Sequence, residues 1–171
     1  MENTFGIPII PENDEERLAK LYEYEILDSL PEKAFNHVAS IAAHMFKVPI
    51  ALVSFVDRER VWYKANTGLP DLNEVPRGTS LCSLAILNDD VTVFENAPTE
   101  PCLLANPFVA GEFGLKFYAA APVKTKEGLK LGAIAIIDKE PRSFSEADQH
   151  VLEHLASIVM DELELRYLKQ K

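Results

Sequence analysis

The sequence predicts an α+β fold, in which an antiparallel sheet is covered by helices from both ends of the chain. Apolar residues recur with helical spacing near each end of the 171-residue chain, and two pairs of apolar, strand-like segments lie between them. Short polar turns join the members of each pair, which makes the paired strands antiparallel. Helices that flank a sheet in sequence can together cover one of its faces.

The chain begins with a short extended segment and continues as one domain. Residues 1–14 contain two prolines and are expected to form an extended lead-in, whereas 15–171 have the length of a single domain. The first helix is predicted soon after the lead-in, because Leu18, Leu21 and Tyr22 have the i, i+3, i+4 spacing of one helix face.

A second helix is predicted from its start signal and its apolar stripe. The run Ser29-Leu30-Pro31-Glu32 matches a capping box, in which the serine hydroxyl accepts an amide N–H and the glutamate reaches back. Pro49 ends the helix. The stripe that would lie on the core consists of Phe35, Val38, Ala39, Ala42, Met45 and Phe46.

The first strand pair follows this helix. Residues 51–56 are mostly apolar on both alternating faces, which predicts a central strand that is covered on both sides. The turn 57–59 leads to a second strand, in which Trp62 and Lys64 share one face and Tyr63 points to the other. An indole and an ammonium on one wall favour a pocket for an anionic ligand. A core tryptophan with a lysine at the sheet edge would explain the same pattern.

The middle of the chain is expected to combine short elements with a long connection. A loop is predicted over 70–78, a helix over 80–87 and a short strand over 91–94. The segment 96–114 holds three prolines and two glycines, which indicates an irregular connection. Long ordered connections of this kind often carry function.

The last strand pair and the last helix complete the predicted fold. Strands are predicted over 117–123 and 131–137, and their alanine and glycine residues leave space above the sheet for a close-packed helix or a ligand. The run Ser145-Glu146-Ala147-Asp148 is a second capping box, which opens a helix that continues to about Leu168.

Composition and charge argue against several classes of partner. The formal charge of −10 disfavours nucleic acid and anionic membrane surfaces. No basic and apolar leader follows Met1, and no apolar stretch has the length of a membrane span. Two cysteines are too few for a disulfide framework. These observations predict a cytoplasmic protein with no nucleic-acid or membrane partner.

From about residue 15 to residue 168 the chain resembles the GAF domain family. The resemblance rests on the strand pair near 49–69, on Pro-Arg-Gly-Thr-Ser-Leu-Cys at 76–82, on Ala-Asn-Pro-Phe-Val-Ala-Gly at 105–111, and on the two late strands. It implies a six-stranded antiparallel sheet with the N- and C-terminal helices on one face. A small-molecule pocket would lie under loops and a short helix on the other face.

The candidate pocket residues come from four segments. Arg77, Ser80 and Cys82 lie where a loop meets a helix, and free amides and an arginine at such a junction can hold an anion. Ser80 can equally serve as a helix cap. The full set of ligand-pocket candidates is Trp62, Lys64, Arg77, Ser80, Cys82, Asn106, Phe108, Phe117 and Tyr118.

Cys82 raises the question of a cofactor or of catalysis. Bilin-binding relatives have histidine after the cysteine, but Ser83 follows here, so bilin is not expected; haem is not expected either, and no other cofactor is indicated. Relatives that reduce free methionine sulfoxide use a cysteine cluster, in which Cys102 would be the partner of Cys82. A reactive thiolate needs a cationic neighbour, for which Arg77 is the candidate. A small buried thiol is the simpler interpretation.

Two further motifs are interpreted as structural. We expect Lys139 and Asp148 to form an ion pair that braces the corner between the last strand and the last helix. His150 and His154 have a spacing that suits a metal but lack a third ligand, so no metal site is predicted. The corner motif of the family is present here as Asp138, Lys139, Phe144 and Asp148.

The sequence therefore predicts a stand-alone, non-catalytic sensory or regulatory domain, which binds a small molecule or a protein partner in signal transduction. The apolar stripe of the last helix is wider than core burial requires, and a homodimer through the terminal helices would cover the excess. Output would pass to a signalling protein in trans. Two alternatives stay open: a cysteine-dependent sulfoxide reductase, and a dimerisation scaffold whose pocket is filled by its own side chains.

Overall fold

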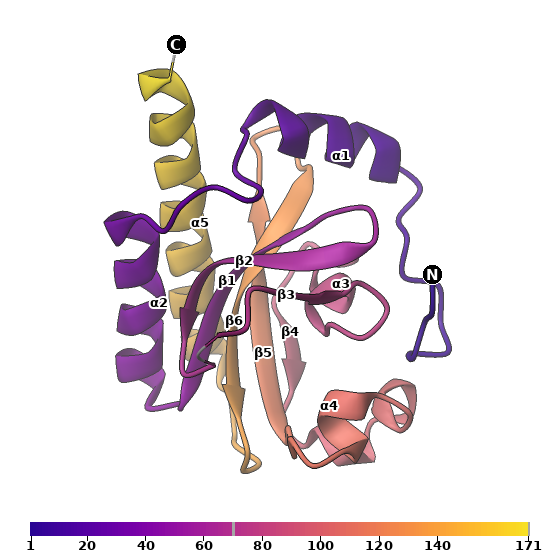
Figure 1. The fold of residues 1–171 in the computed structure, drawn as a ribbon. Coiled ribbons are helices and arrows are strands. Elements are labelled where there is room, and N and C mark those ends of the chain that lie inside the picture. Colours follow the sequence, from indigo (N-terminus) through magenta and orange to yellow (C-terminus); the bar gives the residue numbers. More distant parts are fainter. Residues whose placement is uncertain (70, 171) are drawn as a thin grey trace.

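The computed structural model describes residues 1–69 and 71–170, so position 171, the end of the predicted domain, lies outside the described residues. The core of the molecule is one six-stranded antiparallel sheet (Figure 1). This confirms the predicted α+β class. Across the sheet the strands follow the order β3 (Glu74–Pro76), β2 (Arg60–Thr67), β1 (Ile50–Val56), β6 (Lys130–Asp138), β5 (Phe117–Lys124) and β4 (Thr92–Phe94).

Helices cover both faces of this sheet, but unequally. The long helices α2 (Lys33–Phe46) and α5 (Glu146–Lys169) lie together on one face, and α1 (Asp14–Glu23) crosses the end of the sheet beside β6 (Figure 1). The helical elements described on the opposite face are short. They are α3 (Cys82–Ala85), the 3₁₀ turns η1 (Ala97–Thr99) and η2 (Pro101–Leu103), and α4 (Pro107–Ala110).

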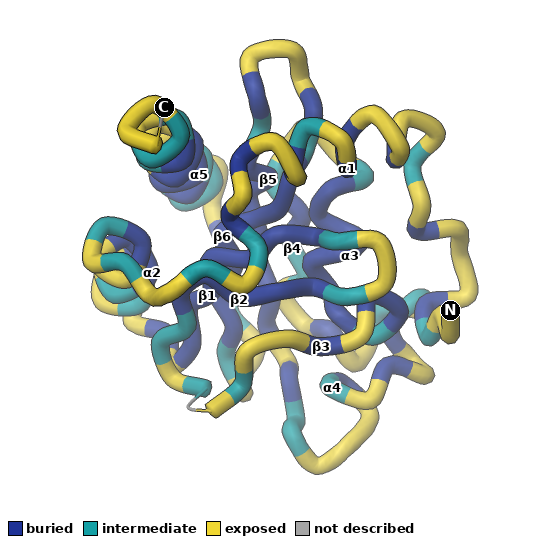
Figure 2. Tube along the Cα trace, turned by 45° about the horizontal axis from the view of Figure 1, so that its top comes forward, coloured by how far each residue is buried: buried dark blue, intermediate teal, exposed yellow. Residues whose placement is uncertain are grey.

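The central strands are buried on both sides, as their uninterrupted apolar runs predict. Every residue of β1 is buried, and successive side chains enter two separate cores. Val53 and Phe55 contribute to the core under α2 and α5, whereas Leu52 and Val56 contribute to the core under α3 and α4. Figure 2 shows that burial concentrates in the sheet, while most turns at its margins are exposed.

The two predicted capping boxes have different outcomes. Ser145 caps α5 in both directions with Asp148, which confirms that prediction. The box predicted at Ser29 is wrong, because Glu32 is the residue that precedes α2 and its side chain makes no capping bond. Both side chains are instead occupied by the ammonium of Lys64, a partner from a distant strand.

The lead-in bends at residues 4–7 and turns at 12–13, and Asp14, which the prediction included in it, begins α1. It is also part of the fold. Phe5 and Ile9 are buried among the residues under α3 and α4. The amide of Thr4 donates to the carbonyl of Gly78 at 3.0 Å. A side chain at position 78 would lie 1.4 Å from the carbonyl oxygen of Glu2, so only glycine permits this close approach. The lead-in therefore continues the domain on the side of α3 and α4, as Figure 1 shows.

The irregular segments contain more structure than their composition predicts. The predicted loop over 70–78 includes the edge strand β3, which pairs with β2. The long connection 96–114 folds into η1, η2 and α4, with Asn106 capping α4 by accepting the amide of Phe108. Within the part of the chain described, no helix combines the length and apolarity that crossing a membrane requires.

Candidate functional site

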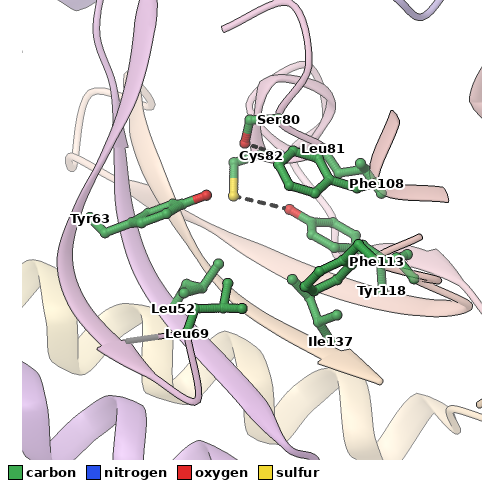
Figure 3. A pocket seen from close by; sticks show the side chains of 11 residues that line it. Leu52, Tyr63, Leu69, Ser80, Leu81, Cys82, Phe108, Phe113, Tyr118 and Ile137 are labelled. Atoms are coloured by element: carbon green, nitrogen blue, oxygen red, sulfur yellow. Dashed lines mark hydrogen bonds between the residues drawn. The ribbon is translucent and has the colours of Figure 1, made fainter. Parts of the chain in front are cut away.

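A small cavity lies on the face of the sheet that α3 and α4 cover. Its volume, measured as space open to the centre of a water molecule, is about 20 Å³, which is enough for one water or slightly more. The strands β1, β2, β5 and β6 supply its floor, and the segments 80–82 and 108–115 supply its roof (Figure 3). The described lining residues are Leu52, Tyr63, Leu69, Ser80, Leu81, Cys82, Phe108, Phe113, Leu115, Tyr118 and Ile137.

Three polar side chains converge on the Cys82 side of this cavity. The hydroxyl of Tyr118 donates to Cys82 Sγ at 3.2 Å, and Ser80 Oγ accepts the Cys82 amide at 3.2 Å. The hydroxyl of Tyr63 points toward the same sulfur from the opposite wall (Figure 3). Burial raises the pKa of both tyrosines well above the ordinary value, so both are neutral hydrogen-bonding groups at physiological pH.

Four of the predicted pocket candidates line the cavity: Ser80, Cys82, Phe108 and Tyr118. The same segments supply neighbours that the sequence analysis did not select, such as Leu81 and Phe113. Tyr63 is the most informative omission, because it is adjacent in sequence to the selected Trp62. The selection chose the wrong face of β2, since alternation shows which residues share a face but not which face meets the cavity.

Trp62 and Phe117 are not cavity residues, which corrects two of the predictions. Trp62 is paired with Phe55 across β1 and β2, and both rings belong to the core under α2 and α5. Phe117 lies in the same core, where its ring contacts that of Phe144 at a centroid distance of 5.6 Å. The simpler interpretation of Trp62, packing in a core, is therefore correct.

Lys64 also points away from the cavity. It is the extra residue of a β-bulge, because Ser54 pairs with Tyr63 while Val53 pairs with Ala65. Lys64 nevertheless keeps the side of β2 that Trp62 occupies, as alternation predicts, and its contacts lie at the start of α2. The bulge brings the next residue, Ala65, to the same core. The prediction that this ammonium binds an anionic ligand in the cavity is wrong for that reason.

The contacts of Lys64 form a network that joins three elements. Its ammonium donates to Ser29 Oγ at 2.8 Å, to the carbonyl of Leu30 at 2.6 Å and to the carboxylate of Glu32 at 2.6 Å. Arg166 of α5 contacts the same carboxylate at 2.7 Å. Burial alone would raise the pKa of Glu32, but the hydrogen bonds from Lys64 and Arg166 outweigh it and hold the pKa below its ordinary value.

Arg77 is not available to a ligand either. Its guanidinium is fully buried and grips the carboxylate of Asp14 through two bonds of 2.8 and 3.0 Å. Arg17 contacts the same carboxylate at 2.9 Å. Burial would raise the pKa of Asp14, but the bonds and charges of the two arginines lower it below its ordinary value. Arg77 thus fixes α1 to the segment that leads into α3.

Asn106 is likewise a positioning residue that does not line the cavity. Its side-chain amide donates to the carbonyl of Thr79 at 2.9 Å and to the hydroxyl of Thr4 at 3.1 Å. Its side-chain oxygen caps α4. One buried asparagine therefore ties together the lead-in, the segment before α3 and the helix that carries Phe108.

The small residues of β5 and β6 do not border the cavity. Ala120, Ala133 and Ala135 lie on its side of the sheet, but α3 packs directly against these strands. Larger residues of the same two strands, Tyr118 of β5 and Ile137 of β6, line the cavity instead. Of the two uses predicted for the space above the small residues, a close-packed helix is the one observed.

The corner between β6 and α5 is built differently from the prediction. The ion pairs of the described residues do not include one between Lys139 and Asp148, because Asp148 accepts the Ser145 amide and Asp138 pairs with Arg142 at 3.2 Å. Lys139 lies over the ring of Phe113, 4.8 Å from its centroid. Phe144 is buried at the corner, as a core residue.

The cation that the sequence analysis assigned to Cys82 is engaged elsewhere. Cys82 and Cys102 are free, and burial followed by the charge of Glu100 raises the pKa of Cys102. Arg77, the cation proposed to activate Cys82, is paired with Asp14. The described residues include no cluster of three or more His, Cys, Asp or Glu that could hold a metal, and exposed His150 pairs with glutamates of its own helix.

Comparison with known proteins defines the class of this fold. The GAF domain model matches residues 30–163, so the chain belongs to the GAF domain family, as its motifs predicted. It is 39% identical over 154 residues to the cyclic di-GMP phosphodiesterase PA2567 of Pseudomonas aeruginosa. The match covers 90% of this chain but only 26% of that protein.

Solved structures of low sequence identity share the fold. The GAF domain of a phosphoenolpyruvate-protein phosphotransferase from Coxiella burnetii superposes with a TM-score of 0.67 at 18% identity, covering 91% of this chain and 95% of that one. Free methionine-R-sulfoxide reductase from Neisseria meningitidis gives a TM-score of 0.65 at 16% identity, covering 92% and 91%. The fold is thus common to a GAF domain of a phosphotransferase and to a sulfoxide reductase, so the fold by itself does not define an activity.

Proposed function

We propose that this chain is a non-catalytic regulatory GAF domain, which binds a small molecule in the cavity under α3 and α4. The observation that carries the proposal is the cavity itself, which gathers two tyrosine hydroxyls, a serine and a thiol within an otherwise apolar lining. A concave apolar site with a few convergent polar groups is the usual form of a ligand pocket. The two free cysteines suit a reducing cytoplasm.

The connections of the cavity roof support a route for the signal. Ser80 and Cys82 lie three and five residues after Arg77, and Arg77 binds Asp14 at the start of α1. Gly78 and Thr79 are bonded to the lead-in directly and through Asn106. If a ligand displaced the segment 77–82, these contacts would therefore displace the lead-in and α1 as well.

We propose that the receiving surface is a homodimer interface on α2 and α5. The outer sides of these helices expose large apolar residues, which a second copy would cover. The stripe on α5 continues to its C-terminal end. The exposed residues are Ile41 and Met45 of α2 and Ile158, Leu165 and Leu168 of α5.

The output is proposed to act on a separate signalling protein. This proposal is supported by the similarity to one part of a cyclic di-GMP phosphodiesterase, a protein named for an activity in nucleotide signalling. Catalysis by the chain itself is not proposed, because no described lining residue is an acid, a histidine or a base beside Cys82. A thiol needs such a neighbour to become a nucleophile at neutral pH.

A ligand screen with a filled-cavity control tests this function. Fractions of a metabolite extract should raise the unfolding temperature of the wild-type chain and alter amide exchange in the lead-in and α1. Cys82→Met adds volume inside the cavity and should abolish both effects. Native mass spectrometry would identify the bound compound and the dimer. Turnover of methionine sulfoxide by wild type but not by Cys82→Ser, or a screen in which no fraction stabilises the wild type, would contradict the proposal.

A further inference from the structure

One tyrosine hydroxyl faces the cavity without a hydrogen-bond partner among the described residues. Tyr63 is 9% exposed, and its hydroxyl makes no hydrogen bond with any described residue. It points into the cavity, toward Cys82 (Figure 3). Among the described residues, the fully buried side-chain atoms without a partner are Arg17 Nη2 and Arg77 Nε, so the Tyr63 hydroxyl is open to the cavity and available to a bound molecule.

The other polar groups show what kind of partner is missing. The proton of Tyr118 is already committed to Cys82 Sγ, and Ser80 Oγ already accepts the amide of Cys82. The hydroxyl of Tyr63 is therefore free to donate, and the thiol proton of Cys82 is free as a second, weaker donor. Both face the same space, which suits an oxygen atom that accepts hydrogen bonds.

Charge excludes the anionic ligands that the sequence alone suggested. The described lining of the cavity contains no charged side chain. Lys64 and Arg77, the cations that the sequence analysis placed in the pocket, are buried elsewhere against Glu32 and Asp14. Lys139, which lies over the ring of Phe113, is exposed. A phosphate or carboxylate in this cavity would lose its hydration without gaining a counter-charge, which disfavours its binding.

The size of the site sets a further limit. A volume of about 20 Å³ for water centres admits a few heavy atoms unless the roof moves. Phe108 and Phe113 belong to the roof, and their rings make an edge-to-face contact at a centroid distance of 5.7 Å. Their rings and the leucine and isoleucine side chains would contact an apolar body, while Tyr63 would hold its oxygen.

We propose that the ligand is a small uncharged molecule with an apolar body and one hydrogen-bond-accepting oxygen, such as a ketone. Tyr63 is then the residue that selects the oxygen. This inference rests on the proposed regulatory function and specifies the chemical class that the site accepts. Anionic nucleotides, including cyclic di-GMP, are excluded from the cavity.

Matched small probes test this proposal by NMR of ¹³C-labelled methyl groups of Leu52 and Ile137, both in the lining. Acetone and cyclopentanone should shift these signals, whereas acetate, which has the shape of acetone and a negative charge, should not. Tyr63→Phe should weaken binding of cyclopentanone about five- to tenfold, as expected for one hydrogen bond. Binding of methylenecyclopentane, which has the same shape without the oxygen, should change less than about twofold in this variant.

Three outcomes would overturn the ligand class. The first is a stronger NMR shift with acetate or cyclic di-GMP than with acetone. The second is an equal loss of affinity for cyclopentanone and methylenecyclopentane in Tyr63→Phe. The third is the absence of a shift with any probe. The first would leave the regulatory function standing with a charged ligand. Failure of the regulatory function is measured separately, by the response of the lead-in and α1 to metabolite fractions. The unfolding temperature of Tyr63→Phe, expected to match wild type, controls for misfolding.

Discussion

The two faces of the sheet use the same strands for different purposes. Under α2 and α5, Trp62, Phe55 and Phe117 fill the space between sheet and helices. Under α3 and α4, short elements held by side-chain bonds leave a cavity, and Tyr63 and Tyr118 point their hydroxyls into it. Adjacent residues of one strand, Trp62 and Tyr63, therefore differ in role. The helix face stabilises the domain, and the cavity face is free to carry specificity.

The largest effect is expected on the helix face. Trp62→Ala should lower the free energy of unfolding by about 3–5 kcal/mol, because it removes a large buried ring and the core closes only partly around the space. Urea denaturation would measure the loss. Tyr63→Phe is the matched change on the cavity face and should cost far less, since its hydroxyl makes no hydrogen bond with a described residue. Similar losses in the two variants would break the distinction between the faces.

The next effect concerns the link between the cavity face and α1. Asp14→Asn should destabilise by about 3 kcal/mol, because Arg17 and Arg77 would stay buried without their shared carboxylate. Arg17 Nη2 and Arg77 Nε already have no hydrogen-bond partner among the described residues. Glu15→Gln is the control, since Glu15 pairs with Arg58 at the exposed surface. Chemical denaturation that ranked the control as the more damaging change would refute this account.

A smaller effect is expected where the lead-in meets the cavity roof. Gly78→Ala places a methyl group against the backbone of Glu2 and should displace residues 2–9, at a cost of about 1–3 kcal/mol. Hydrogen exchange of the amide of Thr4 would report the displacement. Gly128→Ala replaces another loop glycine, remote from the lead-in, and should leave that exchange unchanged. Persistent protection of Thr4 in Gly78→Ala would show that the contact is dispensable.

The smallest effect is a difference in acid sensitivity on the helix face. The folded-state pKa of Glu32 lies below its ordinary value of 4.5, so its ionised form stabilises the native state. That contribution is complete above the unfolded pKa and is lost as pH falls through the folded pKa. Glu32→Gln should be less stable than wild type at pH about 7, and the two should converge as the pH falls below 4.5 and through the lower folded-state pKa of Glu32. Parallel unfolding curves across this range would contradict the predicted role of Glu32.

Much of the fold follows from local sequence patterns. The apolar run of β1 predicts burial on both faces, and Ser145 with Asp148 predicts the start of α5, because both signals depend on neighbours in sequence. The capping box at Ser29 failed for the opposite reason. Lys64 reaches its side chains from a strand more than 30 residues away, and a buried ammonium requires these acceptors more than the helix end does.

The candidate site was predictable in its segments but not in its orientation. The loop-to-helix junction at Ser80 and Cys82 and the end of the connection 96–114, at Phe108 and Phe113, do border the cavity. Arg77 and Asn106 have the right chemistry for binding, but their partners Asp14 and Thr4 come from the N-terminal part of the chain. Local sequence gives no measure of such long-range competition for a polar side chain.

By itself, the sequence determined the α+β class, the antiparallel strand pairs, the GAF motifs and the segments from which the site is built. Only the tertiary structure decided that Tyr63, and not Trp62, lines the cavity. It also decided that Lys64 and Arg77 form ion pairs within the protein. The physical reason is that alternation along a strand is a local property. Which face is filled, and which charge finds a partner, depends on elements brought together from the whole chain.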